Sequence, residues 1–258
     1  MSLTIVTWNV NSLKARADYV ARFLDAEAPD ILAIQELKLA TEKVPRELFE
    51  SRGYHLAVHG QKQWNGVLIA SKQPITEEVV GLPEADEGQA RLVACATSGL
   101  HLVNLYCPQG QSADSPKFVY KLAFFDALNA WLRSHHDPTQ KLVVLGDINI
   151  APHADDLWDP AAFEGVPSFH PKEHERWKEL IDFGLHDAVL PFIEKGTYSF
   201  WDYRSGRFRY NQGMRIDHIL VTETLHKSVC EAGVMRPWRK KIDGMTASDH
   251  APVFIKTN

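Results

Sequence analysis

The sequence contains few cysteines and no long apolar run. Its 258 residues include three cysteines (Cys95, Cys107 and Cys230) and no CxxC pair. Three cysteines cannot all pair with one another, so we expect them to be packing residues in a reducing cytosol. No apolar run approaches the roughly 18 residues of a membrane span, and residues 1–12 lack the features of a signal peptide. These absences favour a cytoplasmic protein with no membrane partner.

Several catalytic motifs are absent as well. The chain has no GxxxxGKS/T phosphate loop, no GxSxG nucleophile elbow and no HExxH helix. A glycine-rich nucleotide cradle, serine-hydrolase chemistry and a zinc site therefore lose support.

The charge of the chain is unevenly distributed. The formal net charge is −5, from 28 basic and 33 acidic residues, which alone argues against nucleic-acid binding. Two segments are nevertheless strongly basic, YRSGRFRYNQGMR (203–215) and RPWRKK (236–241). Their arginines and lysines alternate with aromatic residues, a mixture suited to phosphates and to stacking on sugars or bases. The alternative is that both are ordinary solvated loops.

Short β-branched runs bounded by polar residues, glycine or proline predict strands. They cover residues 3–9, 31–36, 66–71, 91–97, 100–107, 141–147, 215–221 and 251–257. Helical spacing of apolar residues predicts helices over residues 13–24, 118–132 and 171–184. This order predicts an α/β fold of two packed mixed sheets with helices outside, in a single domain over residues 1–258. A split into two domains is the alternative.

Polar side chains that suit a metal or a phosphate stand at the ends of five predicted strands and inside a sixth. In VVLGDINIAP (143–152), Asp147 and Asn149 follow an apolar run, and as strand residues they would share one face. The others are Asn9, Asn11, Glu36, Tyr106, Gln109, Asp217, Asp249 and His250. Any one of them is more often a cap or a surface residue, but adjacent strand ends would gather all of them at one edge.

This collection is rich in oxygen ligands and contains no cysteine. Such sites suit Mg²⁺, with Mn²⁺ as a substitute, and the ion often shares itself with a substrate phosphate. Metal-assisted attack of water on a phosphodiester fits the inventory best.

Seven motifs resemble, in order and spacing, those of the exonuclease III family of apurinic/apyrimidinic endonucleases, in the deoxyribonuclease I-like endonuclease/exonuclease/phosphatase superfamily. They are WNVNSL, IQELK, YCPQG, GDINIAP, FWDYRS, GMRIDHIL and SDHAPV, from about residue 5 to residue 255. The resemblance implies a four-layer α/β sandwich and a monomeric, Mg²⁺-dependent DNA repair nuclease. Its expected activities on duplex DNA are hydrolysis 5′ of abasic sites, 3′-to-5′ exonuclease action and 3′-phosphodiesterase action. We expect it in a bacterial or archaeal cytoplasm, with nucleoid DNA as substrate.

The resemblance also implies catalytic roles for single residues. Asp147 would position or deprotonate the attacking water, and Asn149 would orient that water. Asp217 would hold His250 against the phosphate, and Tyr106 would lie near the same phosphate.

Further roles concern the metal and the substrate. Glu36 would be the principal metal ligand, with Asn9, Asn11 and Asp249 beside it; some relatives carry aspartate in place of Asn11. The substrate-binding residues would be Gln109, Phe200, Trp201, Met214 and Ile216, to which the basic segment adds Arg207 and Arg209. Phe200, Met214 and Ile216 would line an apolar pocket for a flipped-out abasic sugar, although packing in the core is the usual fate of such residues.

Three alternatives stay open. The protein could act mainly as a 3′-to-5′ exonuclease, because Met214 replaces the tryptophan or leucine of relatives and leaves the pocket size open. It could hydrolyse lipid or inositol phosphates through the same kind of site. It could also bind nucleic acid without catalysis, but the acidic residues of the motifs are all present.

Overall fold

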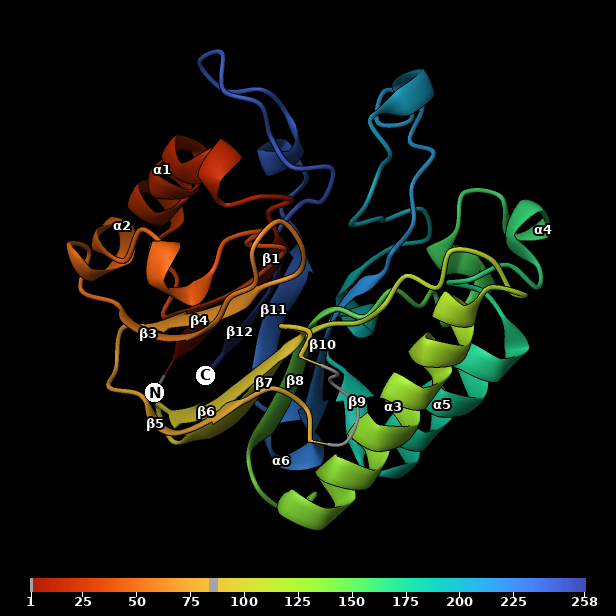
Figure 1. Ribbon diagram of the computed structural model, residues 1–258, viewed down its shortest axis with the longest axis horizontal. Coiled ribbons are helices and arrows are strands. Elements are labelled where there is room, and N and C mark those ends of the chain that lie inside the picture. The colour runs from red at the N-terminus through yellow and green to blue at the C-terminus, as the bar shows by residue number, and fades with distance from the viewer. Residues whose placement is uncertain (1, 84–87) are drawn as a thin grey trace.

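The computed structural model describes residues 2–83 and 88–258. Two six-stranded sheets pack face to face, and helices cover the outer face of each sheet (Figure 1). The strands are β1 (Leu3–Asn9), β2 (Ile31–Gln35), β3 (His55–His59), β4 (Val67–Ser71), β5 (Thr76–Val80), β6 (Leu92–Thr97), β7 (Leu100–Tyr106), β8 (Leu142–Asp147), β9 (Leu185–Asp187), β10 (Asp217–Thr222), β11 (Val229–Val234) and β12 (Val253–Thr257). The α-helices are α1 (Ala17–Glu27), α2 (Glu47–Glu50), α3 (Pro116–His135), α4 (Pro160–Phe163), α5 (Pro171–Asp182) and α6 (Glu223–His226). Short 3₁₀ turns cover Lys14–Arg16, Thr41–Lys43, Ala154–Asp156, Leu190–Phe192, Arg204–Gly206 and Arg236–Arg239.

The two sheets share one plan. Their strand orders are β11-β12-β1-β2-β4-β3 and β5-β6-β7-β8-β10-β9. Each contains one parallel pair, β1 with β2 and β7 with β8, and the pairs around it are antiparallel. The first strand of the chain therefore pairs with the last one, with Leu3 opposite Thr257. Because both ends of the chain build one sheet, we propose that residues 1–258 form one domain.

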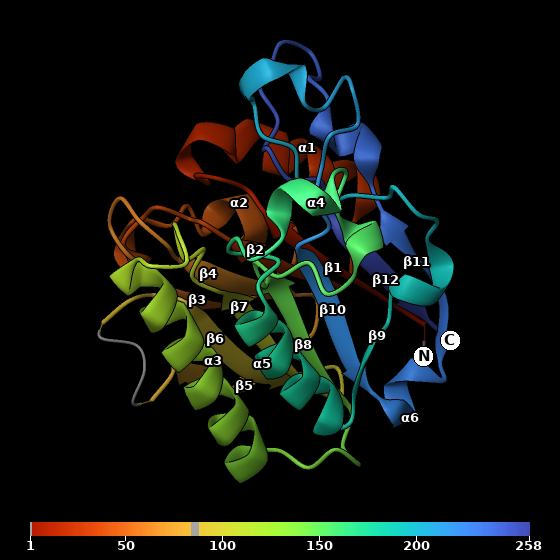
Figure 2. The same cartoon turned by 90° about the vertical axis from the view of Figure 1, so that its right-hand side faces the viewer.

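Three apolar layers hold the sandwich together. The central layer lies between the sheets and contains Ile5, Val143 and Ile219 from both of them. An outer layer under α1 packs Phe23 against β1, and the other packs Phe125 of α3 against the second sheet. In Figure 2, α3 and α5 lie together over the outer face of the second sheet, away from α1 and α2. The predicted four-layer α/β sandwich is confirmed.

Sequence patterns predicted the interior strands of the two sheets but not their edge strands. Each of the eight predicted strand segments overlaps a strand, and the three predicted helices correspond to α1, α3 and α5. The four strands that were not predicted are β3, β5, β9 and β11, which are the outermost strands of the two sheets. In the described part of the chain, no helix has both the length and the apolar character needed to cross a bilayer.

Candidate active site

Strand alternation brings polar side chains to one edge of the sandwich. The apolar residues with odd numbers in β1, β8 and β10, and those with even numbers in β7, belong to the layer between the sheets. Because side chains alternate with a period of two, the polar residues that end or begin these strands turn to the same interior. They are Asn9, Tyr106, Asp147 and Asp217, and the register places Asp147 opposite both Tyr106 and Asp217.

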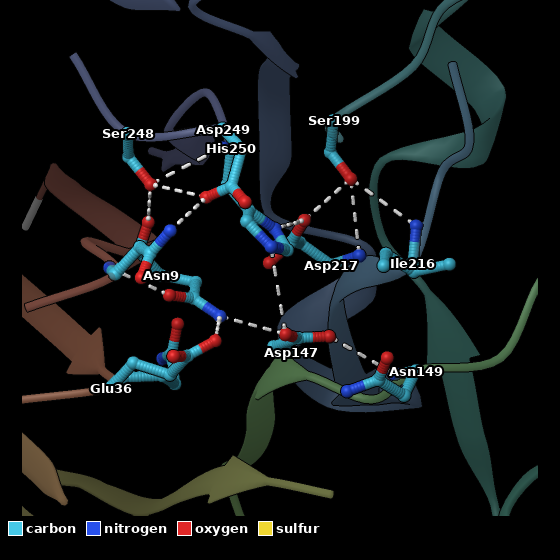
Figure 3. Close-up of polar contacts among 12 residues, drawn as sticks. Asn9, Glu36, Asp147, Asn149, Ser199, Ile216, Asp217, Ser248, Asp249 and His250 are labelled. Carbon is cyan, nitrogen blue, oxygen red and sulfur yellow. Dashed lines mark hydrogen bonds and ion pairs between the residues drawn. The ribbon is translucent and has the colours of Figure 1, made fainter. Parts of the chain in front are cut away.

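Asp147 lies at the centre of this edge and is almost fully buried. Asn9 Nδ2 donates a 2.8 Å hydrogen bond to Asp147 Oδ2, so an amide of one sheet holds a carboxylate of the other (Figure 3). Burial, followed by the charge of Asp217, raises the pKa of Asp147 to about 8. A carboxylate tuned in this direction is suited to accept a proton near neutral pH.

The loop after β8 carries Asn149 into the site by a turn. The prediction that Asp147 and Asn149 share a strand face is wrong, because β8 ends at Asp147 and Asn149 is left-handed (φ 57°). Asparagine tolerates this conformation better than most residues. The backbone N–H of Asn149 donates to Asp147 Oδ1 over 3.2 Å. Gly146 precedes them because a Cβ there would collide with the carbonyl oxygen of Leu105.

His250 and Asp217 form a buried pair. His250 Nδ1 donates to Asp217 Oδ2 over 2.8 Å, and Ser199 Oγ donates to the same oxygen over 2.6 Å (Figure 3). The other ring nitrogen of His250, Nε2, lies 3.8 Å from Asp147 Oδ2. Burial alone would lower the pKa of His250, but the charges of Asp217 and Asp147 raise it to about 10. His250 is therefore an imidazolium at neutral pH.

Glu36 lies beside this cluster in a left-handed turn (φ 55°). Its Oε1 accepts a 2.9 Å hydrogen bond from Asn9 Nδ2, and its Oε2 lies 2.8 Å from Lys38 Nζ. Burial would raise the pKa of Glu36, but Lys38 and Asn9 together lower it, so the side chain is a carboxylate at neutral pH.

Asn11 links Lys38 to Asp249. Lys38 Nζ donates to Asn11 Oδ1 over 2.6 Å, and Asn11 Nδ2 donates to Asp249 Oδ1 over 3.0 Å. A carboxamide suits this place because it accepts from a cation at one end and donates to a carboxylate at the other. An aspartate there would face Asp249 with a like charge.

This acidic edge is able to hold a cation. Asp147, Asp217 and His250 bring their ligand atoms within 4.8 Å of one another. A doubly protonated His250 has no lone pair for a metal, which leaves oxygen donors such as those of Glu36 and Asp249. Among the described residues, Asp217 Oδ1 is a buried acceptor with no hydrogen-bond partner. A donor set made of oxygens fits a hard divalent cation.

A cavity of about 170 Å³ opens over these groups. It is lined by Glu36, Tyr106, Gln109, Asp147, Asn149, Ser168, Phe200, Met214, Ile216, Asp249 and His250. One wall is apolar: Phe200 and Met214 form a two-way backbone bridge of 2.9 and 3.0 Å beside Ile216. The ring of Phe200 lies 4.8 Å from that of His250, so the apolar wall and the charged groups face one space.

The sequence profile of the endonuclease/exonuclease/phosphatase family matches residues 6–250. The chain belongs to this family. It is 32% identical to the exodeoxyribonuclease III of Haemophilus influenzae over 98% of this chain and 99% of that protein. The resemblance to the exonuclease III family is confirmed.

Two solved structures are similar over nearly their whole length. One is the 3′ phosphatase NExo from Neisseria bound to a product DNA hairpin, with 37% identity, a TM-score of 0.94 and 99% coverage of both chains. The other is an AP endonuclease from Archaeoglobus fulgidus, with 32% identity, a TM-score of 0.92 and 98% coverage of both chains.

Three residues predicted to bind substrate lie outside the cavity of this family member. Trp201 is fully buried beside Tyr198, and its Nε1 donates to Asn211 Oδ1 over 3.2 Å. Its side chain therefore packs in the interior and does not line the cavity. Arg207 lies over the ring of Trp158 at 4.8 Å, and the exposed Arg209 lies 5.8 Å from the ring of Tyr210.

Sequence reasoning missed several residues that shape the site. Ser199 supports Asp217, Lys38 supports Glu36, and Ser168 lines the cavity. Ser199 and Ser168 could not be predicted from the sequence, because a single serine in a loop belongs to no motif or periodic pattern. Lys38 stood in the IQELK motif and could have been predicted from its distance of two residues from Glu36.

Proposed function

We propose that this protein is a Mg²⁺-dependent DNA repair nuclease that hydrolyses the phosphodiester 5′ of an abasic site. It also acts as a 3′-to-5′ exonuclease and a 3′-phosphodiesterase on duplex DNA. One observation carries the proposal: a buried base, an imidazolium and an apolar wall surround one cavity of about 170 Å³. The first two suit phosphodiester hydrolysis, and the third suits a sugar without its base.

Asp147 is the group that orients the attacking water and accepts its proton. The two hydrogen bonds from Asn9 and the Asn149 backbone fix the carboxylate, so both its oxygens have defined directions. A positioned base of this kind contributes by geometry first and by pKa second. Asn149 lines the same cavity and orients the water and the phosphate.

His250 stabilises the negative charge that develops on the phosphate oxygens. Its Nδ1–H is committed to Asp217, which leaves the Nε2–H free to donate to the phosphate. Fixed donors aimed at developing charge act strongly in a water-poor site. Tyr106 adds a neutral hydroxyl, because burial and then the charge of Glu36 raise its pKa well above the usual value. Gln109 lines the same cavity.

Glu36 would be the main ligand of Mg²⁺, with Asp249, Asn9 and Asn11 around it, and Mn²⁺ would substitute. The bound ion would supply positive charge next to the departing 3′ oxygen. The carboxylate state of Glu36 at neutral pH supports this assignment.

The apolar wall would favour an abasic sugar over an intact nucleotide. Phe200, Met214 and Ile216 offer no hydrogen-bond partner to a base edge, and the cavity beside them is small. An abasic sugar is cheap to unstack and fits such a space, whereas an intact nucleotide does not. This supports abasic DNA as the substrate.

The two basic segments, 203–215 and 236–241, would bind the DNA duplex. Phe208 joins them, because the guanidinium groups of Arg236 and Arg239 lie 4.4 and 5.1 Å from its ring. Both segments lie at the end of the molecule that contains the active site, which is the top in Figures 1 and 2. We propose that a monomer binds duplex DNA there, in the cytoplasm of a bacterium or archaeon.

A second candidate is an enzyme that acts mainly at 3′ ends. It is favoured by the 38% identity, over 99% of this chain, to a structure described as the 3′-5′ exonuclease NExo from Neisseria meningitidis, with a TM-score of 0.93. The two candidates share the catalytic groups and differ in whether the cavity accepts an internal abasic sugar.

The test uses a duplex with one stable abasic analogue, labelled at the 5′ end of the damaged strand. Products are resolved by length with Mg²⁺, with chelator and with the Asp147→Ala variant, beside an undamaged duplex. We expect one cut at the analogue that chelator and Asp147→Ala abolish. A ladder that shrinks from the 3′ end without that cut would support the second candidate. No cleavage of either duplex would refute both.

A further inference from the structure

Two histidines and a glutamate gather at the end of β10 that lies away from the active site. Asp217, in the active site, begins β10, and Glu223 follows its last residue. A strand of this length spans on the order of 20 Å, so the two ends do not share ligands. In Figure 1, α6 lies at the bottom of the sandwich and the basic segments lie at the top.

Regular structure fixes the three side chains relative to one another. The pairing of β9 with β10 places His186 opposite Val221, two residues before α6 begins. Glu223 and His226 are three residues apart in that helix, so they share one of its faces. His186 Nε2 lies 3.1 Å from Glu223 Oε2, and the rings of His186 and His226 stack at 4.9 Å.

We propose that His186, Glu223 and His226 bind a divalent cation of the zinc type. Two imidazoles and one carboxylate form a ligand set that zinc prefers, with the fourth position left to water. The three ligand atoms lie within 4.8 Å of one another. Tetrahedral coordination brings such atoms to about 3.3 Å from each other, a small shift for side chains that are partly exposed.

The surroundings support a cation at this place. Lys227 Nζ lies 3.0 Å from Glu223 Oε1, which holds the carboxylate so that Oε2 faces His186. Supporting contacts of this kind orient the ligands of metal sites. His186 and His226 also line a cleft of about 280 Å³, so water or a small ligand can reach the fourth position.

The cluster differs in chemistry from the active site. Nitrogen donors favour zinc and similar transition metals over Mg²⁺, which prefers oxygen. The proposal therefore goes beyond the nuclease function and does not depend on it. Occupation of this second site stabilises the junction of β9, β10 and α6, since a ligand that binds only the folded state raises stability.

The experiment measures Zn²⁺ binding by competition with a coloured chelator, in excess Mg²⁺ to occupy the oxygen-rich site. We expect one equivalent of Zn²⁺ per chain and an affinity at least about tenfold weaker in His226→Ala and in His186→Gln. His55→Gln removes an exposed histidine of the other sheet, and Glu36→Gln removes a carboxylate of the active site; both should bind as the parent does.

Two results would overturn the proposal. One is the absence of Zn²⁺ binding in excess Mg²⁺, and the other is equal affinity in the parent, His226→Ala and His186→Gln. Circular dichroism of the metal-free variants verifies that each is folded. Co²⁺ in place of Zn²⁺ gives an independent reading, because a tetrahedral site produces strong visible absorption that His226→Ala should lose.

Discussion

Lys121 and Glu173 form an ion pair in which neither side chain reaches solvent. Lys121 Nζ also donates to the carbonyl oxygen of Asn149 over 2.7 Å, and Glu173 Oε1 accepts from the backbone N–H of Ser168 over 3.2 Å. Asn149 and Ser168 both line the candidate active site. One buried pair, which connects α3 to α5, thus fixes the backbone of two residues in the cavity wall.

Replacing Lys121 by methionine should destabilise the protein by about 3–5 kcal/mol, because it leaves Glu173 buried without its counter-charge. The free energy of unfolding is measured by urea denaturation. Lys117→Met is the matched control, since Lys117 is exposed on the same helix and should cost little. The double variant Lys121→Met with Glu173→Gln should recover part of the loss. A single variant as stable as the parent would contradict this account of the pair.

Asp217→Asn should move the alkaline limit of activity to lower pH. The charge of Asp217 is the largest contribution that raises the pKa of His250, to about 10 from 6.5, against the effect of burial. Without it, His250 loses its proton at a lower pH, and the phosphate loses its cationic partner. The profile of kcat/KM against pH measures the shift. Ser199→Ala keeps the charge of Asp217 and should leave the limit in place; an unmoved limit in Asp217→Asn would refute the role of the pair.

Met214→Trp should reduce cleavage at an abasic analogue at least about tenfold, because the larger ring narrows the apolar side of the cavity. Removal of a 3′-phosphate should change less, since it requires no sugar inside the duplex to turn out of the stack. Both rates are measured on matched duplexes. Met214→Leu, which nearly conserves volume, should retain both activities. Equal losses of both activities in Met214→Trp would place the effect on the catalytic groups.

Replacing Arg207 and Arg209 by alanine should weaken DNA binding and flatten its dependence on salt. Each phosphate contact that is lost reduces the slope of log affinity against log salt by about 0.9. Fluorescence anisotropy across a salt series gives the slope. Arg133→Ala, at the far end of α3, removes an exposed charge away from the basic segments and should leave the slope unchanged. An unchanged slope in the double variant would place the duplex elsewhere.

Interior and edge strands differ in what their sequences reveal. An interior strand of this sandwich is covered on both faces, so β8 and β4 are entirely buried and read as apolar runs. An edge strand pairs on one side only and carries polar residues, as in TEEVV of β5, where all five residues are exposed. β5 is a strand because it pairs with β6. This pairing cannot be predicted from the sequence of β5 alone.

The same reasoning separates the predictable part of the site from the rest. Asn9, Asp147 and Asp217 end or begin strands that the sequence shows as apolar runs, and the two-residue period of a strand turns them to the interior between the sheets. Ser199 and Lys121 act through contacts made across distant parts of the chain, with Asp217 and with Asn149. Such contacts depend on the packing of loops and helices, so no local spacing indicates them.

The pairing of β1 with β12 has a consequence for synthesis on the ribosome. β1 is synthesised before β12, and it lacks this antiparallel neighbour until β12 has been made, because β12 lies between β1 and β11 in the sheet. Until then Asn9, which holds Asp147 and Glu36, stands on a strand without its antiparallel neighbour. A chain that has been synthesised only as far as β11 therefore carries most of the acidic residues without the geometry that joins them, and the capacity to cut a phosphodiester arises only once β12 has been made.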